Sequence, residues 1–421
     1  MLKAPRGTSD ILPEEQHYWQ FVERKAAALC QLYGYERIET PVFEDAALFS
    51  RSMGDGTDIV DKEMYLFKDR GNNALALRPE GTAPVCRAYL EHGMHNRPQP
   101  VKLYYLITAF RYERPQAGRY RQHHQFGFEA IGSDDPALDA EVMEMAWQFY
   151  GSMDMGELSL LINSIGCRQC RPDYVQALRG YYSGLSAQPC PDCQVRLKHN
   201  PLRLLDCKDQ SCQSLAEGAP RSADHLCPAC AAHFQAVQAY LDLLELSFQV
   251  NHRLVRGLDY YTRTVFEVQP AAEGAQSTLG GGGRYDGLIE ELGGRPTPGI
   301  GFATGLERII LNLKQGTTPL PPPERPLVYI AAIGPEAKRQ AVRLASRLRR
   351  SSLPALTIYG ERSLKAQLKQ VHSLGIPYAA IIGEEELKGG TVLLRDMVNS
   401  EQKPVPLESL PHHLRTLAPQ A

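Results

Sequence analysis

The chain has 421 residues, which is too long for one ordinary core and predicts two or three domains. Its 43% apolar and 22% charged residues exclude a disordered chain, and a net charge of −2 argues against a wholly basic protein that coats nucleic acid. There is no run of about 18 apolar residues and no apolar signal core at the start, so we expect no transmembrane helix and a cytoplasmic location.

The first third of the sequence alternates helical and extended patterns. Apolar residues spaced three and four apart predict a helix over residues 13–33, and residues 35–41 look extended up to a proline. A short strand at 75–77 leads into the sequence RPEGT, and Thr82 is the expected N-cap of a helix over 82–92.

A hairpin is predicted next, from strand-forming residues at 101–113 and an alternating pattern at 123–131. Its polar face carries Arg111, Glu113, Gln125, Gly127 and Glu129. A guanidinium beside carboxylates and an amide suits a zwitterionic substrate together with a phosphate. The same alternation also fits an exposed sheet face with ordinary cross-strand ion pairs, and both interpretations stay open.

Eight of the ten cysteines lie between residues 167 and 230, in three CxxC pairs typical of zinc sites and one pair, Cys207 and Cys212, separated by four residues. We favour one tetrahedral zinc site made by Cys190, Cys193, Cys227 and Cys230, although the gap between these pairs is long. The alternative is a set of free cysteines in a small insert with a poor core, so the metal is left unknown.

Two further segments carry chemistry-bearing residues. The segment 256–261, RGLDYY, combines a cation, a glycine and two tyrosines, although an amphipathic edge segment fits it equally well. The glycine clusters at 280–283 and 299–305 match neither a dinucleotide-binding nor a P-loop pattern. They fit either a close approach of backbone to a flat ligand or tight turns.

A proline-rich linker at 317–326 separates off the C-terminal part of the chain, where strand and helix patterns alternate. From residue 325 onward, 14 Lys and Arg stand against 8 Asp and Glu, a net charge of +6 that leaves −8 for the rest. A helix predicted at 336–350 holds six basic residues and is a candidate surface for nucleic-acid phosphates.

Taken together, the segments resemble a class II aminoacyl-tRNA synthetase, specifically the histidyl-tRNA synthetase family of bacterial type. Residues 34–41, 110–129 and 299–308 resemble the three motifs that define the class. The segments 78–82 and 256–261 resemble the histidine-specific signatures, and the second of these is the most discriminating.

The resemblance implies the fold class and the domains. An α+β catalytic core, built on an antiparallel sheet with flanking helices, would span residues 1–325. A mainly helical, cysteine-rich insertion at 167–247 would interrupt it and arch over the tRNA acceptor stem. An anticodon-binding α/β domain with a mostly parallel sheet would span 326–421.

The resemblance also implies a reaction in which histidine and ATP form histidyl-adenylate and pyrophosphate, and histidine then passes to the 3′ end of histidine tRNA. The catalytic residues would be Arg111 and Arg256. Histidine would be bound by Glu80, Thr82, Gln125, Glu129, Tyr260 and Tyr261, and ATP by Arg111, Glu113 and Arg308. Gln116, Arg119 and Arg121 would contact the tRNA acceptor end.

For cofactors and partners, the resemblance implies ATP with Mg²⁺ as a substrate complex, histidine tRNA and a homodimer, and no membrane. It does not imply zinc. One rival is the synthetase-like regulatory subunit of ATP phosphoribosyltransferase, which lacks the anticodon domain. Another is a class II synthetase for a different amino acid, in which the segment 256–261 would have arisen by chance.

Overall fold

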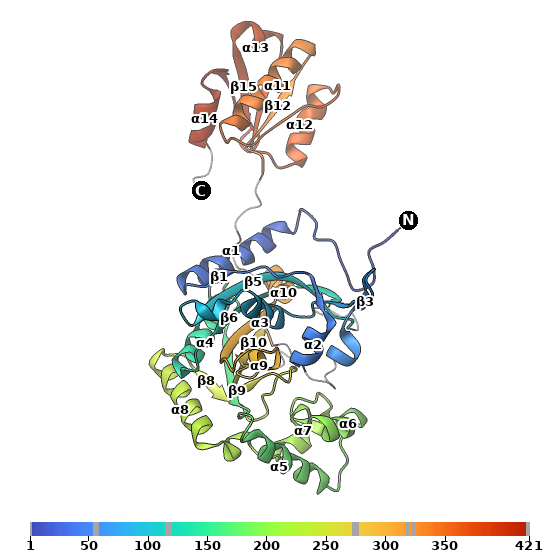
Figure 1. Ribbon diagram of the computed structural model, residues 1–421. Coiled ribbons are helices and arrows are strands. Elements are labelled where there is room, and N and C mark those ends of the chain that lie inside the picture. Colours follow the sequence, from blue (N-terminus) through green and yellow to red (C-terminus); the bar gives the residue numbers. More distant parts are fainter. Residues whose placement is uncertain are drawn as a thin grey trace. The chain divides into compact units, whose positions relative to one another are not determined.

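The computed structural model describes residues 2–53, 59–113, 120–271, 278–316, 320 and 325–417. The chain divides into two compact units, Met1–Pro321 and Pro322–Ala421, the second coloured orange to red in Figure 1. Within the described ranges, no helix has the length and apolar character needed to span a bilayer.

A large sheet of eight strands forms the centre of the first unit. Its spatial order is β1 (Glu36–Arg37), β5 (Val101–Phe110), β6 (Gln122–Ile131), β11 (Gly299–Gly305), β10 (Gly280–Arg284), β9 (Thr262–Pro270), β7 (Leu158–Ser164) and β8 (Phe248–Val250). The inner neighbours from β5 to β7 pair antiparallel, as expected. The edge strands β1 and β8 run parallel to their neighbours, because the long segments that precede β5 and follow β7 act as crossovers.

Helices cover both faces of this sheet. One face packs against α1 (Gln16–Leu32), α4 (Pro136–Gly151), α8 (Pro228–Leu243) and α10 (Leu306–Gln315), with Phe126 and Phe128 of β6 fully buried between them. The other face packs against α3 (Thr82–Glu91) and the short α9 (Leu288–Glu291). The apolar face predicted for β6 is therefore the core face, and its polar residues lie on the side of α3.

Helix α3 begins at Thr82, but the predicted cap is wrong. Gly81 occupies the N-cap position, and the Glu80 carboxylate accepts hydrogen bonds from the backbone N–H groups of Thr82 and Ala83 at 2.5 and 2.8 Å. A carboxylate satisfies these orphan donors better than a hydroxyl because the helix N-terminus carries partial positive charge. The Thr82 side chain is left to donate elsewhere.

A small three-stranded sheet and several short elements complete the first unit outside the cysteine-rich segment. The sheet has the order β2 (Phe43–Asp45), β4 (Ala74–Leu77) and β3 (Leu66–Lys68), all antiparallel. It is accompanied by α2 (Ala46–Met53) and the helical turns η1 (Ile59–Glu63) and η2 (Met94–Asn96). Phe49 and Met53 of α2 are buried in a separate cluster with Ala76 and Ala83.

The cysteine-rich insertion is mainly helical, as expected. Besides α8, it contains α5 (Arg171–Ser183), η3 (Pro201–Leu204), α6 (Pro191–His199), α7 (Gln210–Glu217) and η4 (Ser222–His225). Figure 1 shows α5, α6 and α7 grouped together, with α8 leading back to the large sheet. Tyr174, Leu178 and Tyr182 of α5 are buried within this group.

The second unit has a five-stranded sheet in the order β13 (Ala355–Thr357), β12 (Val328–Ala332), β14 (Tyr378–Ile382), β15 (Thr391–Asp396) and β16 (Gln402–Pro406). The first three strands are parallel and the last two antiparallel, so the sheet is mixed rather than mostly parallel. The sequence did not reveal β16, which contains two prolines that only an edge strand tolerates. The helices of the second unit are α11 (Pro335–Arg350), α12 (Leu364–Ser373), α13 (Glu384–Gly389) and α14 (Leu410–Leu417).

Candidate active site

A cavity of about 370 Å³ in the first unit gathers side chains from segments as far apart as residues 80 and 308. The described residues predicted to bind histidine or ATP all line it: Glu80, Thr82, Arg111, Glu113, Gln125, Glu129, Arg256, Tyr260, Tyr261 and Arg308. The polar hairpin face is thus the wall of a cavity, and the interpretation as an exposed sheet face is wrong.

Glu129 of β6 is the most buried carboxylate of this wall, with 1% of its surface exposed. Its Oε1 accepts hydrogen bonds from Thr82 Oγ1 at 2.7 Å and from the Tyr105 hydroxyl at 3.1 Å, and its Oε2 accepts from the Tyr285 hydroxyl at 2.8 Å. Burial raises the pKa of Glu129 to about 8, although the three hydroxyl donors partly offset it. Sequence reasoning missed Tyr105 and Tyr285 as partners of this group.

The glycine clusters form central strands, β10 and β11, and not tight turns. A Cβ at Gly301 would lie 1.7 Å from Glu129 Oε2, and one at Gly281 would lie 2.8 Å from a terminal nitrogen of Arg256. Glycine therefore makes room for the two charged side chains of the cavity. Gly127 serves differently, because the space beside it is taken by the Tyr105 ring, 2.4 Å from a Cβ there.

The end of the cavity near α3 offers hydrogen-bond acceptors. Glu80 is 2% exposed, and burial raises the pKa of its carboxyl group. Gln125 is 9% exposed, and its buried Oε1 has no hydrogen-bond partner among the described residues. An unpaired buried carbonyl is costly unless a ligand satisfies it, so Gln125 is placed to receive a donor.

Arginine side chains supply positive charge to the lining of the cavity. Arg111 donates from Nε to the Pro79 carbonyl at 2.9 Å, which fixes the plane of its guanidinium. Arg256 forms an ion pair with Glu267 of β9, yet its own Nε is buried without a partner among the described residues. Sequence reasoning missed Glu267, which also accepts from Thr278 Oγ1 at 2.7 Å and so holds Arg256 in place.

Two tyrosines and a third arginine complete the lining. The rings of Tyr260 and Tyr261 are 4.8 Å apart between centroids, and Tyr260 meets Tyr285 edge-on at 6.0 Å. Burial raises the pKa of Tyr261, so its hydroxyl stays protonated near neutral pH and available as a donor. Arg308 of α10 donates to the carbonyl of Thr278, which also lines the cavity.

Comparisons with known proteins identify the family of the chain. The sequence model described as "Histidyl-tRNA synthetase" matches residues 7–169 and 202–309, and that described as "Anticodon binding domain" matches 327–417. A curated histidine–tRNA ligase of Dehalococcoides mccartyi is 61% identical over 411 residues, covering 97% of this chain and 98% of that protein. The chain belongs to the histidyl-tRNA synthetase family.

Other members of the histidyl-tRNA synthetase family match along nearly the whole chain. A histidine–tRNA ligase of Pelotomaculum thermopropionicum is 52% identical over 411 residues, covering 98% of this chain and 97% of that protein. The apo crystal structure of the S. aureus histidyl-tRNA synthetase superposes with a TM-score of 0.83 at 39% identity, covering 99% of this chain and 100% of that one. The predicted family and fold class are confirmed.

The structure describes only one of the three residues expected to contact the tRNA acceptor end. Gln116 and Arg119 lie outside the described residues. Arg121 is described, and its guanidinium stacks 3.8 Å above the Tyr112 ring while its Nε donates to the Glu113 carbonyl at 3.3 Å. Arg121 is therefore anchored beside the cavity rather than placed in its lining.

The cysteine set favoured from the sequence is wrong in its pairing. The described residues contain two groups with converging sulfur atoms: Cys167, Cys170, Cys227 and Cys230, and separately Cys190, Cys193, Cys207 and Cys212. The sequence gap between the CxxC pairs had concealed that each pair finds a different partner pair in space. The family's sequence model does not match residues 170–201, which hold three of these cysteines: Cys170, Cys190 and Cys193.

Proposed function

We propose that the chain is a histidine–tRNA ligase whose cavity makes histidyl-adenylate and then esterifies histidine tRNA. The observation that carries this is the lining of one cavity, which combines the buried acceptors Glu80, Gln125 and Glu129 with the three arginines Arg111, Arg256 and Arg308. A zwitterionic amino acid joined to a nucleotide phosphate needs that distribution of charge.

For histidine, the acceptors Glu80 and Gln125 and the hydroxyl of Thr82 would hold the α-ammonium group. Glu129 would accept from one imidazole nitrogen, and the protonated hydroxyl of Tyr261 would donate to the other, with Tyr260 packed beside it. When the Glu129 carboxyl group is ionised, its three hydroxyl donors leave one lone-pair site, which suits a single N–H group. A side chain without that group would leave buried polar atoms unpaired, a loss worth about 10⁴–10⁵-fold in comparable sites.

For ATP, Arg111 and Arg256 would bind the α-phosphate while the histidine carboxylate attacks its phosphorus and pyrophosphate leaves. Charge spreads over the phosphate oxygens in this transition state, and fixed guanidinium groups stabilise it without reorganising. Glu113 and Arg308 would hold the nucleotide, which enters as its Mg²⁺ complex. The tRNA 3′-hydroxyl would then attack the carbonyl carbon of histidyl-adenylate and release AMP.

For tRNA, the loop with Gln116, Arg119 and Arg121 would reach the acceptor end, and the insertion at 167–247 would cover the acceptor stem. The unit from residue 326 onward would read the anticodon, and the catalytic domain would end at residue 325. The net charge of +6 on the C-terminal part supports this division. We further propose that the enzyme is a homodimer and acts in the cytoplasm.

The test is ATP–pyrophosphate exchange with the purified chain and each amino acid in turn, followed by charging of a histidine tRNA transcript. We expect exchange with histidine alone, and charging of that transcript. Better exchange with another amino acid would assign the chain to a different class II synthetase. No exchange would favour the regulatory subunit, although Arg111, Arg256, Arg308 and the C-terminal unit argue against it.

A further inference from the structure

The insertion brings its eight cysteines into two separate groups of four, and in each group the sulfur atoms lie within 4.8 Å of one another. We call Cys167, Cys170, Cys227 and Cys230 the base cluster, and Cys190, Cys193, Cys207 and Cys212 the outer cluster. None of the eight is joined in a disulfide. None lines the cavity that holds the proposed active site.

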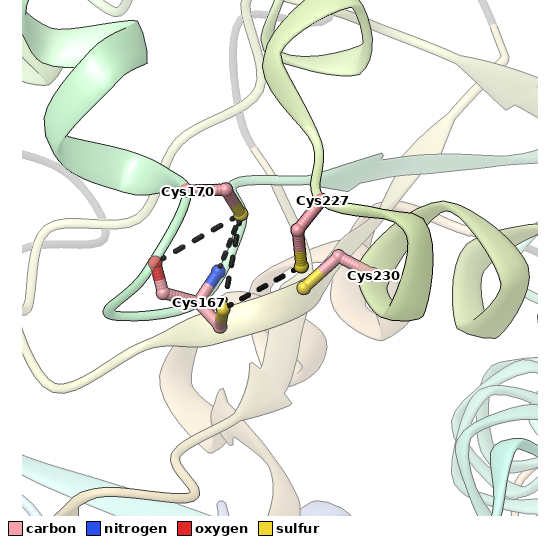
Figure 2. A group of neighbouring side chains, drawn as sticks. All are labelled: Cys167, Cys170, Cys227 and Cys230. Carbon is pink, nitrogen blue, oxygen red and sulfur yellow. Dashed lines mark hydrogen bonds between the residues drawn. The ribbon is translucent and has the colours of Figure 1, made fainter.

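The base cluster lies where the insertion leaves and rejoins the catalytic core. Cys167 follows β7 closely and Cys170 is the N-cap of α5, while Cys227 is the N-cap of α8. Figure 2 shows the four sulfur atoms pointing toward one another from these two stretches of chain. A shared ion here would clamp together two segments 60 residues apart in sequence.

The outer cluster lies wholly inside the insertion. Cys190 is the N-cap of α6, Cys193 lies in its first turn, and Cys212 lies in α7. Cys193, Cys207 and Cys212 are buried. The cluster therefore joins two short helices that bury little apolar surface of their own.

The distances fit one tetrahedral ion in each cluster. Four thiolates at about 2.3 Å from a zinc ion stand about 3.8 Å from one another. In the structure, the distance between Sγ atoms is 3.8 Å for Cys167 and Cys170, 3.9 Å for Cys167 and Cys227, and 3.8 Å for Cys190 and Cys207. A disulfide would need about 2.05 Å. The thiolates of a [4Fe–4S] cluster bind different irons and so lie farther apart than the ligands of a single ion.

The backbone also favours charged sulfur in both clusters. The N–H of Cys167 donates to Cys170 Sγ at 3.3 Å, and the N–H of Cys190 donates to Cys212 Sγ at 3.2 Å. Such outer hydrogen bonds orient sulfur ligands and stabilise the thiolate that a metal requires. A sulfur-only ligand set selects soft or borderline metals such as zinc, and not magnesium or calcium.

We propose that the insertion binds two Zn²⁺ ions, one in the base cluster and one in the outer cluster. Cysteine fills all four positions of each site and leaves none for substrate, which makes both sites structural. The base zinc fixes the two ends of the insertion on the catalytic core, and the outer zinc supplies stability that its short helices lack.

The direct test is elemental analysis of the full chain, purified and washed with a chelator, against a protein concentration from amino-acid analysis. We expect about two zinc ions per chain and no stoichiometric iron. A mercurial reagent that reacts with the thiols of this wild-type protein should release the bound zinc ions, and a zinc indicator in solution then measures how many are released. One zinc or fewer per chain, or iron with acid-labile sulfide, overturns the proposal.

Paired variants assign the ions to their clusters. Cys190→Ser with Cys193→Ser removes the outer site, and Cys167→Ser with Cys170→Ser removes the base site, so each double variant retains about one zinc. Cys30→Ala, a change at a buried cysteine of α1 outside both clusters, is the matched control and retains both ions. Two zinc ions in either double variant would contradict the assignment. If a double variant fails to fold, the release experiment on the wild-type chain still decides the number of ions.

Discussion

Gly301 of β11 lies directly opposite Glu129 of β6 in the register of the central sheet, and a Cβ at Gly301 would lie 1.7 Å from Glu129 Oε2. The carboxylate proposed to recognise imidazole can occupy this buried position because the neighbouring strand lacks a side chain at that point. The segment that resembles the third motif of the class therefore shapes the pocket that we propose for histidine, besides carrying Arg308, which we propose binds ATP.

Replacing Gly301 with alanine is expected to displace Glu129 and disable histidine activation. The methyl group and the carboxylate cannot occupy the same volume, so the three hydrogen bonds to Glu129 must rearrange. We expect kcat/KM for histidine in pyrophosphate exchange to fall by about 10²-fold or more, because a misplaced group loses its contacts in the transition state. The measurement is exchange at varied histidine concentration.

Two comparisons separate this effect from general damage. Gly180→Ala, in α5 where a Cβ meets nothing within 4 Å, should leave exchange unchanged. The loss of thermal stability caused by Gly301→Ala should be smaller in a Glu129→Ala background, because the clash is then removed. Equal losses in both backgrounds would show that the contact with Glu129 is not the cause.

Arg256→Ala is expected to lower the rate of adenylate formation by about 10²-fold or more, because it removes a fixed cation from the developing charge on phosphate. The arginine is already held by Glu267, so its place in the free enzyme is set before substrate binds. Single-turnover formation of histidyl-adenylate measures this step. Arg24→Ala, on the exposed face of α1, is the control, and equal rates in the two variants would rule out the role of Arg256.

The sequence predicted the polar face of β6 because side chains alternate along a strand, and that rule needs no knowledge of neighbouring strands. It did not predict that Tyr105 and Tyr285 would bind Glu129, or that Glu267 would hold Arg256. Tyr105 lies on β5, Tyr285 directly after β10, and Glu267 on β9. Which strands lie side by side is a property of the whole sheet and cannot be read from any one segment. The role of the glycine clusters could not be predicted for the same reason, since the side chains for which these glycines make room lie outside the glycine strands.

The cysteines show the same limit more sharply. CxxC spacing identified pairs of ligands, and chain order suggested joining Cys190 and Cys193 to Cys227 and Cys230. The fold instead returns α8 to the end of β7, which brings Cys227 to Cys167. Pairing in space depends on where the insertion closes, and no local pattern in the sequence carries that information.

The stability of the chain is expected to depend on pH through Glu129. Its pKa is raised to about 8 by burial, while the unfolded chain has an ordinary carboxyl group, so the folded state holds a proton that the unfolded state releases between these values. The stability associated with this proton is fully present below the unfolded pKa and is lost as pH rises through about 8. Glutamine at this position cannot titrate.

Thermal unfolding at several pH values therefore distinguishes wild type from Glu129→Gln. From pH about 5 to about 8.5, we expect the melting temperature of wild type to fall by several degrees relative to the variant. The quantity of interest is how the difference in melting temperature between wild type and Glu129→Gln changes with pH. A constant difference caused by loss of the carboxylate therefore does not affect the result. A pH-independent difference would show that Glu129 is not a buried acid in the folded chain.

The basic face of α11 provides the remaining prediction. Arg343 and Arg350 are exposed on this helix, whereas Ala341, Leu344 and Leu348 bury its other face, so charge reversal leaves the core intact. Because each lost phosphate contact weakens RNA binding, Arg343→Glu with Arg350→Glu should raise KM for histidine tRNA by about tenfold or more. Pyrophosphate exchange requires no tRNA and should not change. Lys388→Glu on α13 reverses charge elsewhere in the same unit and serves as the control; if it raised KM for tRNA equally, net charge rather than the α11 surface would account for binding.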